Sequence, residues 1–334
     1  MRIGLAGAGR IGAFHAATLA ELSAVDQIVV TDAMPGTAAR LAAEQGYVEA
    51  ADVDELLAQV DAFVITTPTN SHATLLRQAV AAGVPTFCEK PLASTVEETS
   101  ELVALVEASG VAVHVGFQRR FDAGYRRARA AVQSGELGFV HTIRANTHDQ
   151  APPPAAYLPT SGGLFRDCSV HDFDIIRFVT GREVVSVFGT GANKGASFFT
   201  EAGDVDTAAA VLTLDDDTLA VVTATRYGGG GHDVRMDVMG SEGTLGVGYD
   251  DSLAVLSAEA DVDYPRGPQK WSFMERFQPA YVSELTAFCE VATGAIPSPC
   301  TVRDALAAFR IAEACDISRL QGRPVLLDEI GVGE

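Results

Sequence analysis

The chain has 334 residues, enough for two domains of ordinary size. Its formal net charge is -20, from 44 acidic and 24 basic residues, and so acidic a surface repels phosphate backbones and anionic lipids. We therefore expect no nucleic acid and no membrane as partners, and we expect a neutral small molecule. The sequence has no apolar run of about 18 residues and no signal-peptide core, so a cytoplasmic protein is expected.

The cysteines indicate a reducing compartment. They are odd in number, scattered and without a C-x-x-C pair: Cys88, Cys168, Cys289, Cys300 and Cys315. This pattern argues against a disulfide framework and against a zinc site. The seven histidines show no zinc-ligand spacing either, so we expect no metal centre.

Strand-like and helix-like segments alternate up to about residue 118. Expected strands span residues 3–6, 27–31, 62–66, 86–88 and 111–115, and expected helices span residues 11–22, 35–45, 71–82 and 95–108. This alternation predicts right-handed βαβ units and a parallel sheet.

Beyond residue 118 the rhythm changes. One expected strand ends with His148 and Asp149, and further strands are expected over residues 184–193, 206–214, 219–226, 234–239 and 244–249. An Asp-rich hairpin turn is expected at 215–217. Successive strands predict an antiparallel sheet. Helices are expected at 123–134, 164–179, 279–293 and 302–320, the last capped by Thr301. The Pro- and Gly-rich stretch 150–163 is expected to be irregular and to act as a substrate lid.

A glycine motif joins the first strand to the first helix. In Gly7-x-Gly9-x-x-Gly12, the first glycine permits a tight turn, the second admits a pyrophosphate, and the third lets helix and strand pack closely. The helix N-terminus would offer free N–H groups to the phosphates. The motif therefore predicts a dinucleotide site.

Asp32 lies 20 residues after Gly12, at the end of the second strand. An acidic residue there binds the ribose hydroxyls and repels a 2′-phosphate, so NAD is expected in preference to NADP. The alternative is that Asp32 only caps the helix that begins near residue 35.

Lys90, Asp167 and His171 form a candidate proton-handling set. Asp167 and His171 are four residues apart, so a helix would place them on one face. His171 suits the removal of a hydroxyl proton, Asp167 could orient its ring, and Lys90 could favour the alkoxide. The alternatives are a histidine satisfied within the structure and a solvated lysine. Cys168 is interpreted as a packed thiol, because nothing adjacent would lower its pKa.

Six segments together resemble the Gfo/Idh/MocA family of oxidoreductases, and within it inositol 2-dehydrogenases. They are residues 7–12 (GAGRIG), 66–72 (TTPTNSH), 89–92 (EKPL), 116–122 (GFQRRFD), 167–172 (DCSVHD) and 240–245 (GSEGTL). The resemblance implies an α/β protein: a Rossmann domain with a doubly wound parallel sheet over 1–118, and a substrate-binding and oligomerisation α/β domain with a largely antiparallel open sheet over 119–334.

The same resemblance implies roles for individual residues. Lys90, Asp167 and His171 would be catalytic. The cofactor site would comprise Gly7, Gly9, Arg10, Ile11, Gly12, Asp32, Thr66, Pro68, Asn70, His72, Glu89 and Lys90. Gln118, Arg119 and Tyr227 match positions that line a polyol site. His148 and Asp149 end a strand and could bind hydroxyls, although a turn or capping role fits them as well.

The resulting hypothesis is oxidation of a secondary alcohol on an inositol or sugar by a homodimer or homotetramer that uses NAD. Two alternatives stay open: a glycoside hydrolase of the same fold that uses NAD transiently, and a non-catalytic NAD-binding sensor. A metal-dependent enzyme is disfavoured by the histidine spacing.

Overall fold

A computed structural model describes residues 1–331, which form two compact units. One unit comprises Met1–Phe121 with Pro279–Leu306, and the other comprises Asp122–Gln278 with the described residues from Ala307 onward. The changes of unit near the C-terminus fall inside helices α10 (Phe273–Ala292) and α11 (Val302–Gln321). The functional boundary proposed after residue 118 stays a prediction, and the structure adds that 279–306 pack with the first unit.

The first unit contains a six-stranded sheet in the order β3-β2-β1-β4-β5-β6, and each neighbouring pair is parallel. Its strands are β1 (Arg2–Ala6), β2 (Gln27–Thr31), β3 (Val48–Glu49), β4 (Ala62–Ile65), β5 (Thr86–Glu89) and β6 (Val113–Gly116). The predicted parallel sheet is confirmed. Strand β3 was not expected, because two residues are too few to show an alternating pattern.

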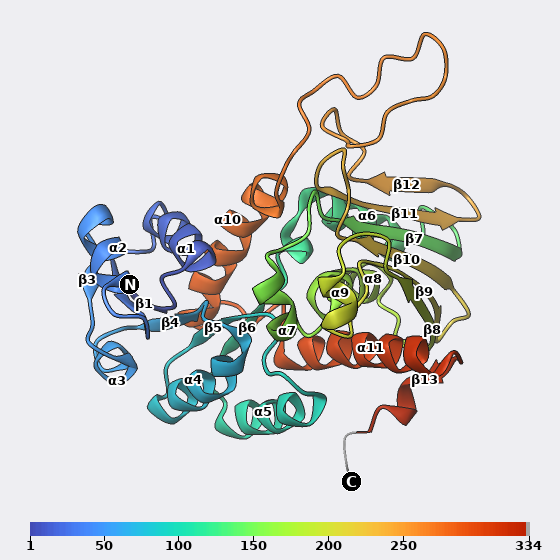
Figure 1. Cartoon of the computed structure of the whole chain (residues 1–334). Helices are drawn as coiled ribbons and strands as arrows, with labels where there is room; N and C mark the ends of the chain where they lie inside the picture. The colour runs from blue at the N-terminus through green and yellow to red at the C-terminus, as the bar shows by residue number, and fades with distance from the viewer. Residues whose placement is uncertain (332–334) are drawn as a thin grey trace. The chain divides into compact units, whose positions relative to one another are not determined.

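Helices cover both faces of this sheet. They are α1 (Arg10–Ala20), α2 (Thr37–Gln45), α3 (Val53–Leu57), α4 (Thr69–Ala82) and α5 (Val96–Ser109), with the 3₁₀ turn η1 (Gln118–Phe121) after β6. Figure 1 shows α1 and α2 on one face and α4 and α5 on the other. Leu285 and Phe288 of α10 join the apolar core beneath α1 and α2, which explains why the sequence segment 279–306 belongs to this unit.

The second unit contains a seven-stranded sheet in the order β12-β11-β7-β10-β9-β8-β13. Its strands are β7 (Val140–His148), β8 (Val184–Ala192), β9 (Thr207–Leu214), β10 (Leu219–Thr225), β11 (Asp233–Gly240), β12 (Thr244–Val247) and β13 (Val325–Leu326). The pairs are antiparallel except β7 with β10, which run parallel. The largely antiparallel sheet is thus confirmed, as is the β9–β10 hairpin, where Asp217 has a φ of 66°.

One face of this sheet is covered by helices α6 (Ala123–Gln133), α8 (Val170–Thr180) and α11 (Figure 1). Thr147 of β7 donates to Asp172 of α8 at 2.7 Å, so residues in phase with Thr147 point toward the helices. We call this the inner face and the opposite one the outer face. The short elements α9 (Phe198–Glu201) and η4 (Leu327–Glu329) complete the unit. Thr301 caps α11, since its Oγ1 accepts from the backbone N–H of Asp304.

Two local expectations need correction. The stretch 150–163 is not wholly irregular, because it contains the 3₁₀ turn η2 (Ala155–Tyr157) and the short helix α7 (Leu158–Ser161). Proline at the start of a helical turn is tolerated because its missing N–H would have no partner there. The helix expected over 164–179 begins as a π-helix, η3 (Phe165–Ser169), before it continues as α8. Such π turns occur often at functional sites.

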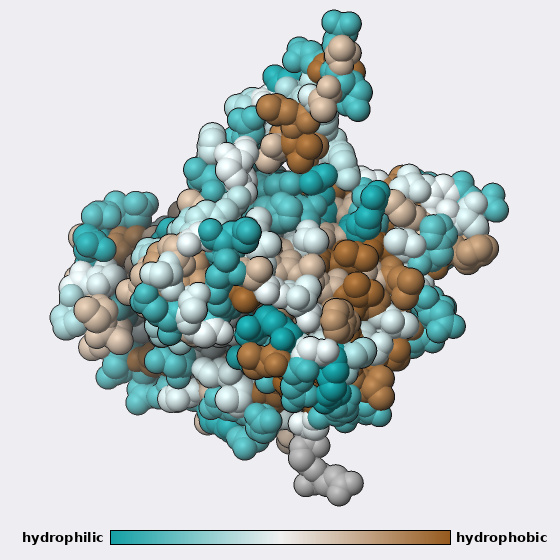
Figure 2. Space-filling model, turned by 45° about the vertical axis from the view of Figure 1, so that its right-hand side comes forward, coloured by the Kyte–Doolittle hydropathy of each residue, from teal (hydrophilic) through white to brown (hydrophobic). Residues whose placement is uncertain are grey.

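The segment between β12 and α10 projects from the second unit (Figure 1). Apolar side chains gather on this projection, as Figure 2 shows, and Val255, Leu256 and Val262 are exposed there. Within residues 1–331, no helix is both long enough and apolar enough to cross a membrane.

Candidate active site

The predicted glycine motif forms an open cradle at the carboxyl end of β1. Gly7 has a φ of +98°, which favours glycine, and it packs against the backbone of Thr66. A Cβ on Gly12 would lie 1.7 Å from the carbonyl oxygen of Gly7, so helix α1 needs glycine there to approach the strand. A Cβ on Gly9 would meet nothing within 4 Å. The cradle therefore has open space in front of Gly9 and the N–H groups of Arg10 and Ile11 at the helix start, which fits a pyrophosphate.

Asp32 lies beside this cradle. Its Oδ2 accepts from the backbone N–H of Ala8 and its Oδ1 from that of Met34, each at 2.7 Å. The carboxylate is half-buried at the end of β2, so it remains accessible to a ribose. Capping and ribose binding are therefore compatible in this geometry.

The carboxyl end of β4 supports the cradle from the other side. The hydroxyl of Thr66 donates to the carbonyl oxygens of Ala6 and Gly7, at 3.0 and 2.9 Å. Pro68 precedes the first turn of α4, and Asn70 follows within that turn. These residues lie at the same sheet edge as Gly7, because all strands of this sheet are parallel.

His72 is placed differently from a direct cofactor ligand. Its ring is 1% exposed, and its two nitrogens lie 2.7 and 2.8 Å from the carbonyl oxygens of Pro91 and Thr67. Burial lowers the pKa of His72, although the two backbone hydrogen bonds raise it. The ring thus ties the turn after β4 to the residue that follows Lys90, and a positioning role fits it better than a contact with the cofactor.

Glu89 and Lys90 follow at the end of β5. Glu89 Oε1 lies 2.6 Å from Nε2 of His15, whose ring is fully buried between Phe87 and Tyr281. Lys90 is half-buried next to this pair. Sequence reasoning missed His15, although its place one turn after Gly12 on α1 predicts an inward-facing side chain. Gln118 and Arg119 lie in η1 after β6 and are 4% and 3% exposed.

In the second unit, Asp167 and His171 lie where η3 passes into α8. Asp167 is in the π-helix and His171 is in the first turn of α8, so the predicted one-turn spacing is present with an altered helical geometry. Both side chains are half-buried. The π turn could not be foreseen, because no sequence period distinguishes it from an α-helix over five residues.

The carboxylate of Asp167 is held from two sides. Arg226 Nη2 lies 2.6 Å from Asp167 Oδ2, and Tyr157 Oη donates to Asp167 Oδ1 at 3.1 Å. Arg226 Nη1 also lies 2.8 Å from Oδ2 of Asp149. Sequence reasoning missed both Arg226 and Tyr157. For Arg226 a signal existed: it is in phase with the inward-facing apolar residues of β10, where a charge is costly unless it is paired.

Asp149 links this arginine to two further groups. Nδ1 of His232 lies 3.5 Å from Asp149 Oδ1, and the Cys168 thiol contacts Asp149 Oδ2 at 3.4 Å. Burial raises the pKa of Asp149, but hydrogen bonds and the charges of His232 and Arg226 outweigh it and hold that pKa well below its usual range. Asp149 is therefore an anion at neutral pH.

His148 and Tyr227 make contacts with other residues of the second unit. His148 is on the outer face of the sheet, with its ring 3.3 Å from the Thr223 hydroxyl and 3.7 Å from Asp233. Tyr227 packs over Gly195, where no Cβ could fit, and its hydroxyl accepts from the N–H of Ala196 at 2.9 Å. Their predicted substrate roles stay predictions.

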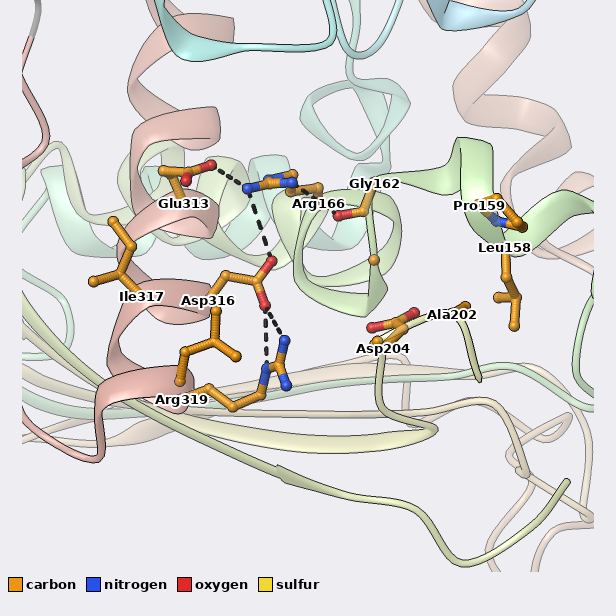
Figure 3. A pocket seen from close by; sticks show the side chains of 13 residues that line it. Leu158, Pro159, Gly162, Arg166, Ala202, Asp204, Glu313, Asp316, Ile317 and Arg319 are labelled. Carbon is orange, nitrogen blue, oxygen red and sulfur yellow. Dashed lines mark hydrogen bonds and ion pairs between the residues drawn. The ribbon is translucent and has the colours of Figure 1, made fainter. Parts of the chain in front are cut away.

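A cavity of about 320 Å³ is lined by residues of α7, η3 and α11, among others (Figure 3). Arg166 points into it and pairs with Glu313 and Asp316 of α11. Arg319 pairs with the same Asp316 at 3.0 Å. No residue predicted for the site lines this cavity. Its ion pairs instead anchor the residue before Asp167, so two successive side chains of η3 are fixed in different directions.

Among the described residues no group of three or more His, Cys, Asp or Glu side chains is arranged to hold a metal ion. The cysteines in residues 1–331 are buried thiols outside any disulfide.

Three features are typical of NAD-binding oxidoreductases. They are the glycine cradle at the start of a parallel sheet, the acidic residue after the second strand, and a second unit that carries an aspartate and a histidine one turn apart. Residues 1–117 match the family described as "Oxidoreductase family, NAD-binding Rossmann fold", and residues 125–246 match "GFO/IDH/MocA C-terminal domain". The chain belongs to the Gfo/Idh/MocA family of oxidoreductases. The predictions of the family, of the enzyme class and of NAD as cofactor are confirmed.

Similarity to known proteins extends over nearly the whole chain. The chain is 40% identical to a myo-inositol dehydrogenase of Streptomyces leeuwenhoekii, over 96% of this chain and 98% of that protein. It is 35% identical to an inositol 2-dehydrogenase of Rhizobium meliloti, over 97% and 98%. The structure of a scyllo-inositol dehydrogenase from Lactobacillus casei, with bound NAD(H) and scyllo-inositol, matches with a TM-score of 0.89 at 29% identity, covering 98% and 99% of the two chains.

Proposed function

We propose that this protein oxidises a secondary hydroxyl of an inositol or a closely related cyclic polyol or sugar, with His171 as the base. The substrate class is supported by the names of the full-length relatives, which are inositol dehydrogenases. The single observation that carries the mechanism is the place of Asp167 and His171 one turn apart, with the Asp167 carboxylate held by Arg226 and Tyr157.

Each residue has one task in this mechanism. His171 accepts the hydroxyl proton, since a histidine can take up a proton near neutral pH. Asp167 favours the imidazolium that results, because a fixed carboxylate stabilises a nearby cation. Lys90 stabilises the alkoxide by its positive charge. NAD, when bound, supplies the nicotinamide C4 that accepts hydride. The turn at Gly7 and Gly9 and the start of α1 would hold its pyrophosphate, and Asp32 would bind its ribose.

The direct test measures NADH formation across a panel of inositols, aldoses and anhydrosugars, with NAD and NADP compared. Substitution His171→Ala should lower kcat by about 10²–10⁴-fold, as expected for loss of a general base. His141→Ala is the matched control, because His141 is exposed and its ring contacts the Thr142 hydroxyl. Unchanged turnover in His171→Ala would reject the assignment.

The same panel separates the two remaining alternatives. A glycoside hydrolase that uses NAD transiently would cleave a glycosidic bond without accumulating NADH. A sensor would bind NAD and produce no NADH with any compound. Stoichiometric NADH from a free polyol contradicts both.

A homo-oligomer is part of the proposal. Phe188, Val211 and Val221 are register partners on β8, β9 and β10, and they are exposed side by side on the outer face. An exposed apolar row of this kind favours a second copy of the chain as its partner. Val211→Glu should lower the mass measured by light scattering, while Ala43→Glu, at an exposed position of α2 in the first unit, should not. A monomeric wild-type protein would contradict this part. We propose a cytoplasmic location because the cysteines of residues 1–331 are thiols outside any disulfide.

A further inference from the structure

Arg226 is a buried cation between two carboxylates. Its side chain is 4% exposed, and it lies 2.6 Å from Asp167 Oδ2 and 2.8 Å from Asp149 Oδ2. Such charge-assisted bonds through the two terminal nitrogens fix the plane of a guanidinium and the orientation of its partners. The three residues come from three elements: the ends of β10 and β7 and the π-helix η3.

The strand order explains how these residues meet. Strands β7 and β10 are parallel neighbours, so their carboxyl ends lie at the same edge of the sheet. Asp149 follows β7 and Arg226 follows β10, and the backbone N–H of Asp149 donates to the carbonyl of Thr225 at 2.9 Å. Asp149 is in phase with Thr147 and Arg226 with Ala224, and both of those face inward. The pair therefore reaches the inner face, where η3 carries Asp167.

The charges explain why Arg226 cannot be replaced freely. A buried guanidinium is stable only when it is paired, and removing it leaves two carboxylates close together in a medium of low dielectric constant. Like charges at this range repel, so Asp167 would rotate away or take up a proton. His232 contacts Asp149 and so helps to hold that carboxylate at the edge of the sheet. Arg226 then joins the held carboxylate to the candidate catalytic Asp167.

We propose that Arg226 is a positioning residue for the reaction, which orients the Asp167 carboxylate and keeps it ionised by tethering it to Asp149. The inference rests on the proposed function, in which Asp167 supports His171. Arg226 itself acts through Asp167. The tether makes Asp149 a second positioning residue, since it holds the other end of the guanidinium.

The test compares Arg226→Ala, Arg226→Lys and Asp149→Asn with the wild type in steady-state kinetics over pH 5–10. Misplacement of a catalytic group can lower the rate on the order of 10²-fold. We therefore expect kcat of Arg226→Ala to fall on the order of 10²-fold, with little change in the Kd for NAD. The lysine variant retains the charge but lacks the fork, and should lie in between. The acid limb of the pH–rate profile should move to higher pH in Arg226→Ala, because the charge that opposes protonation of Asp167 is gone.

Chemical rescue provides a readout that a merely structural role would not move. Added guanidinium at millimolar concentration should restore part of the activity of Arg226→Ala and none of that of His171→Ala. Arg235→Ala is the matched control, because Arg235 pairs with Asp233 at 2.8 Å on the outer face of the same sheet. We expect its kcat, pH profile and response to guanidinium to match those of the wild type.

The outcomes separate this inference from the proposed function. If wild-type protein turns over a polyol while Arg226→Ala retains its kcat and pH profile, the positioning role is wrong and the function stands. If wild-type protein acts on no polyol, the function is wrong. A double-mutant cycle of Arg226→Lys with Asp167→Asn on the free energy of unfolding still tests the tether, and additive effects would refute it.

Discussion

Tyr157 Oη donates a hydrogen bond to Asp167 Oδ1 at 3.1 Å, which ties the predicted lid segment to a candidate catalytic carboxylate. Tyr157 belongs to η2, in the middle of the stretch 150–163. Burial and the neighbouring Asp167 raise the pKa of Tyr157, so the phenol stays protonated and donates throughout the working pH range. The lid segment thus contacts the site through a side chain that the sequence pattern did not single out.

Substitution Tyr157→Phe tests this contact. The substitution keeps the ring and removes one hydrogen bond to a charged group. Such a bond contributes about 1.5–3 kcal/mol. We expect kcat/KM for the polyol to fall by about tenfold or more with the fold retained, because Tyr157 is exposed on its other side. Tyr264→Phe on the projecting segment is the control. Equal kcat/KM in Tyr157→Phe and wild type would show that the contact has no role in turnover.

The two glycines Gly9 and Gly12 should respond differently to alanine. In Gly12→Ala the Cβ would clash with the Gly7 carbonyl at 1.7 Å, and such overpacking costs about 1–3 kcal/mol, so both the melting temperature and NAD affinity should fall. In Gly9→Ala the Cβ meets open space, so stability should be retained while NAD affinity falls. Calorimetric titration with NAD and thermal unfolding measure the two effects. Undiminished NAD binding by Gly9→Ala would contradict the placement of the pyrophosphate.

Asp32 should control the choice of cofactor. Asp32→Asn keeps the size of the side chain and removes the charge that would repel a 2′-phosphate, so the ratio of kcat/KM for NADP to that for NAD should rise at least about tenfold. The single oxygen of the asparagine can accept from only one of the Ala8 and Met34 N–H groups, so we expect a lower melting temperature with the fold retained. A wild-type enzyme that prefers NADP would overturn this interpretation of Asp32.

Asp233 on the outer face should make the free energy of unfolding depend on pH in the acid range. Burial raises its pKa, but the nearby His148 ring and the two hydrogen bonds from Arg235 lower it to about 2. A carboxyl whose folded pKa is depressed contributes stability above its unfolded pKa, near 3.9, and loses it as the pH falls toward 2. Urea unfolding of wild type should therefore lose on the order of 2 kcal/mol in this window because of Asp233. Asp233→Asn should remove that part of the slope, and Asp263→Asn, at an exposed position, should not.

Much of the first unit follows from local sequence. The glycine motif and Asp32 act through backbone close to them, and the strands and helices around them show regular apolar patterns, so their places are encoded within about 30 residues. The spacing of Asp167 and His171 is equally local. The elements that the sequence did not predict are short or atypical. Strand β3 has two residues, and the π turn has no sequence period of its own.

The sequence by itself thus determined the family, the parallel sheet, the glycine cradle and the one-turn spacing of Asp167 and His171, because these depend on spacing along the chain. Only the tertiary structure decided that Arg226, 59 residues after Asp167, is the residue that holds it, that Tyr157 contacts it as well, and that His148 faces outward. The physical reason is strand order and phase. The parallel pairing of β7 with β10 puts Asp149 beside Arg226 on the inner face, and no pattern within either strand contains that information.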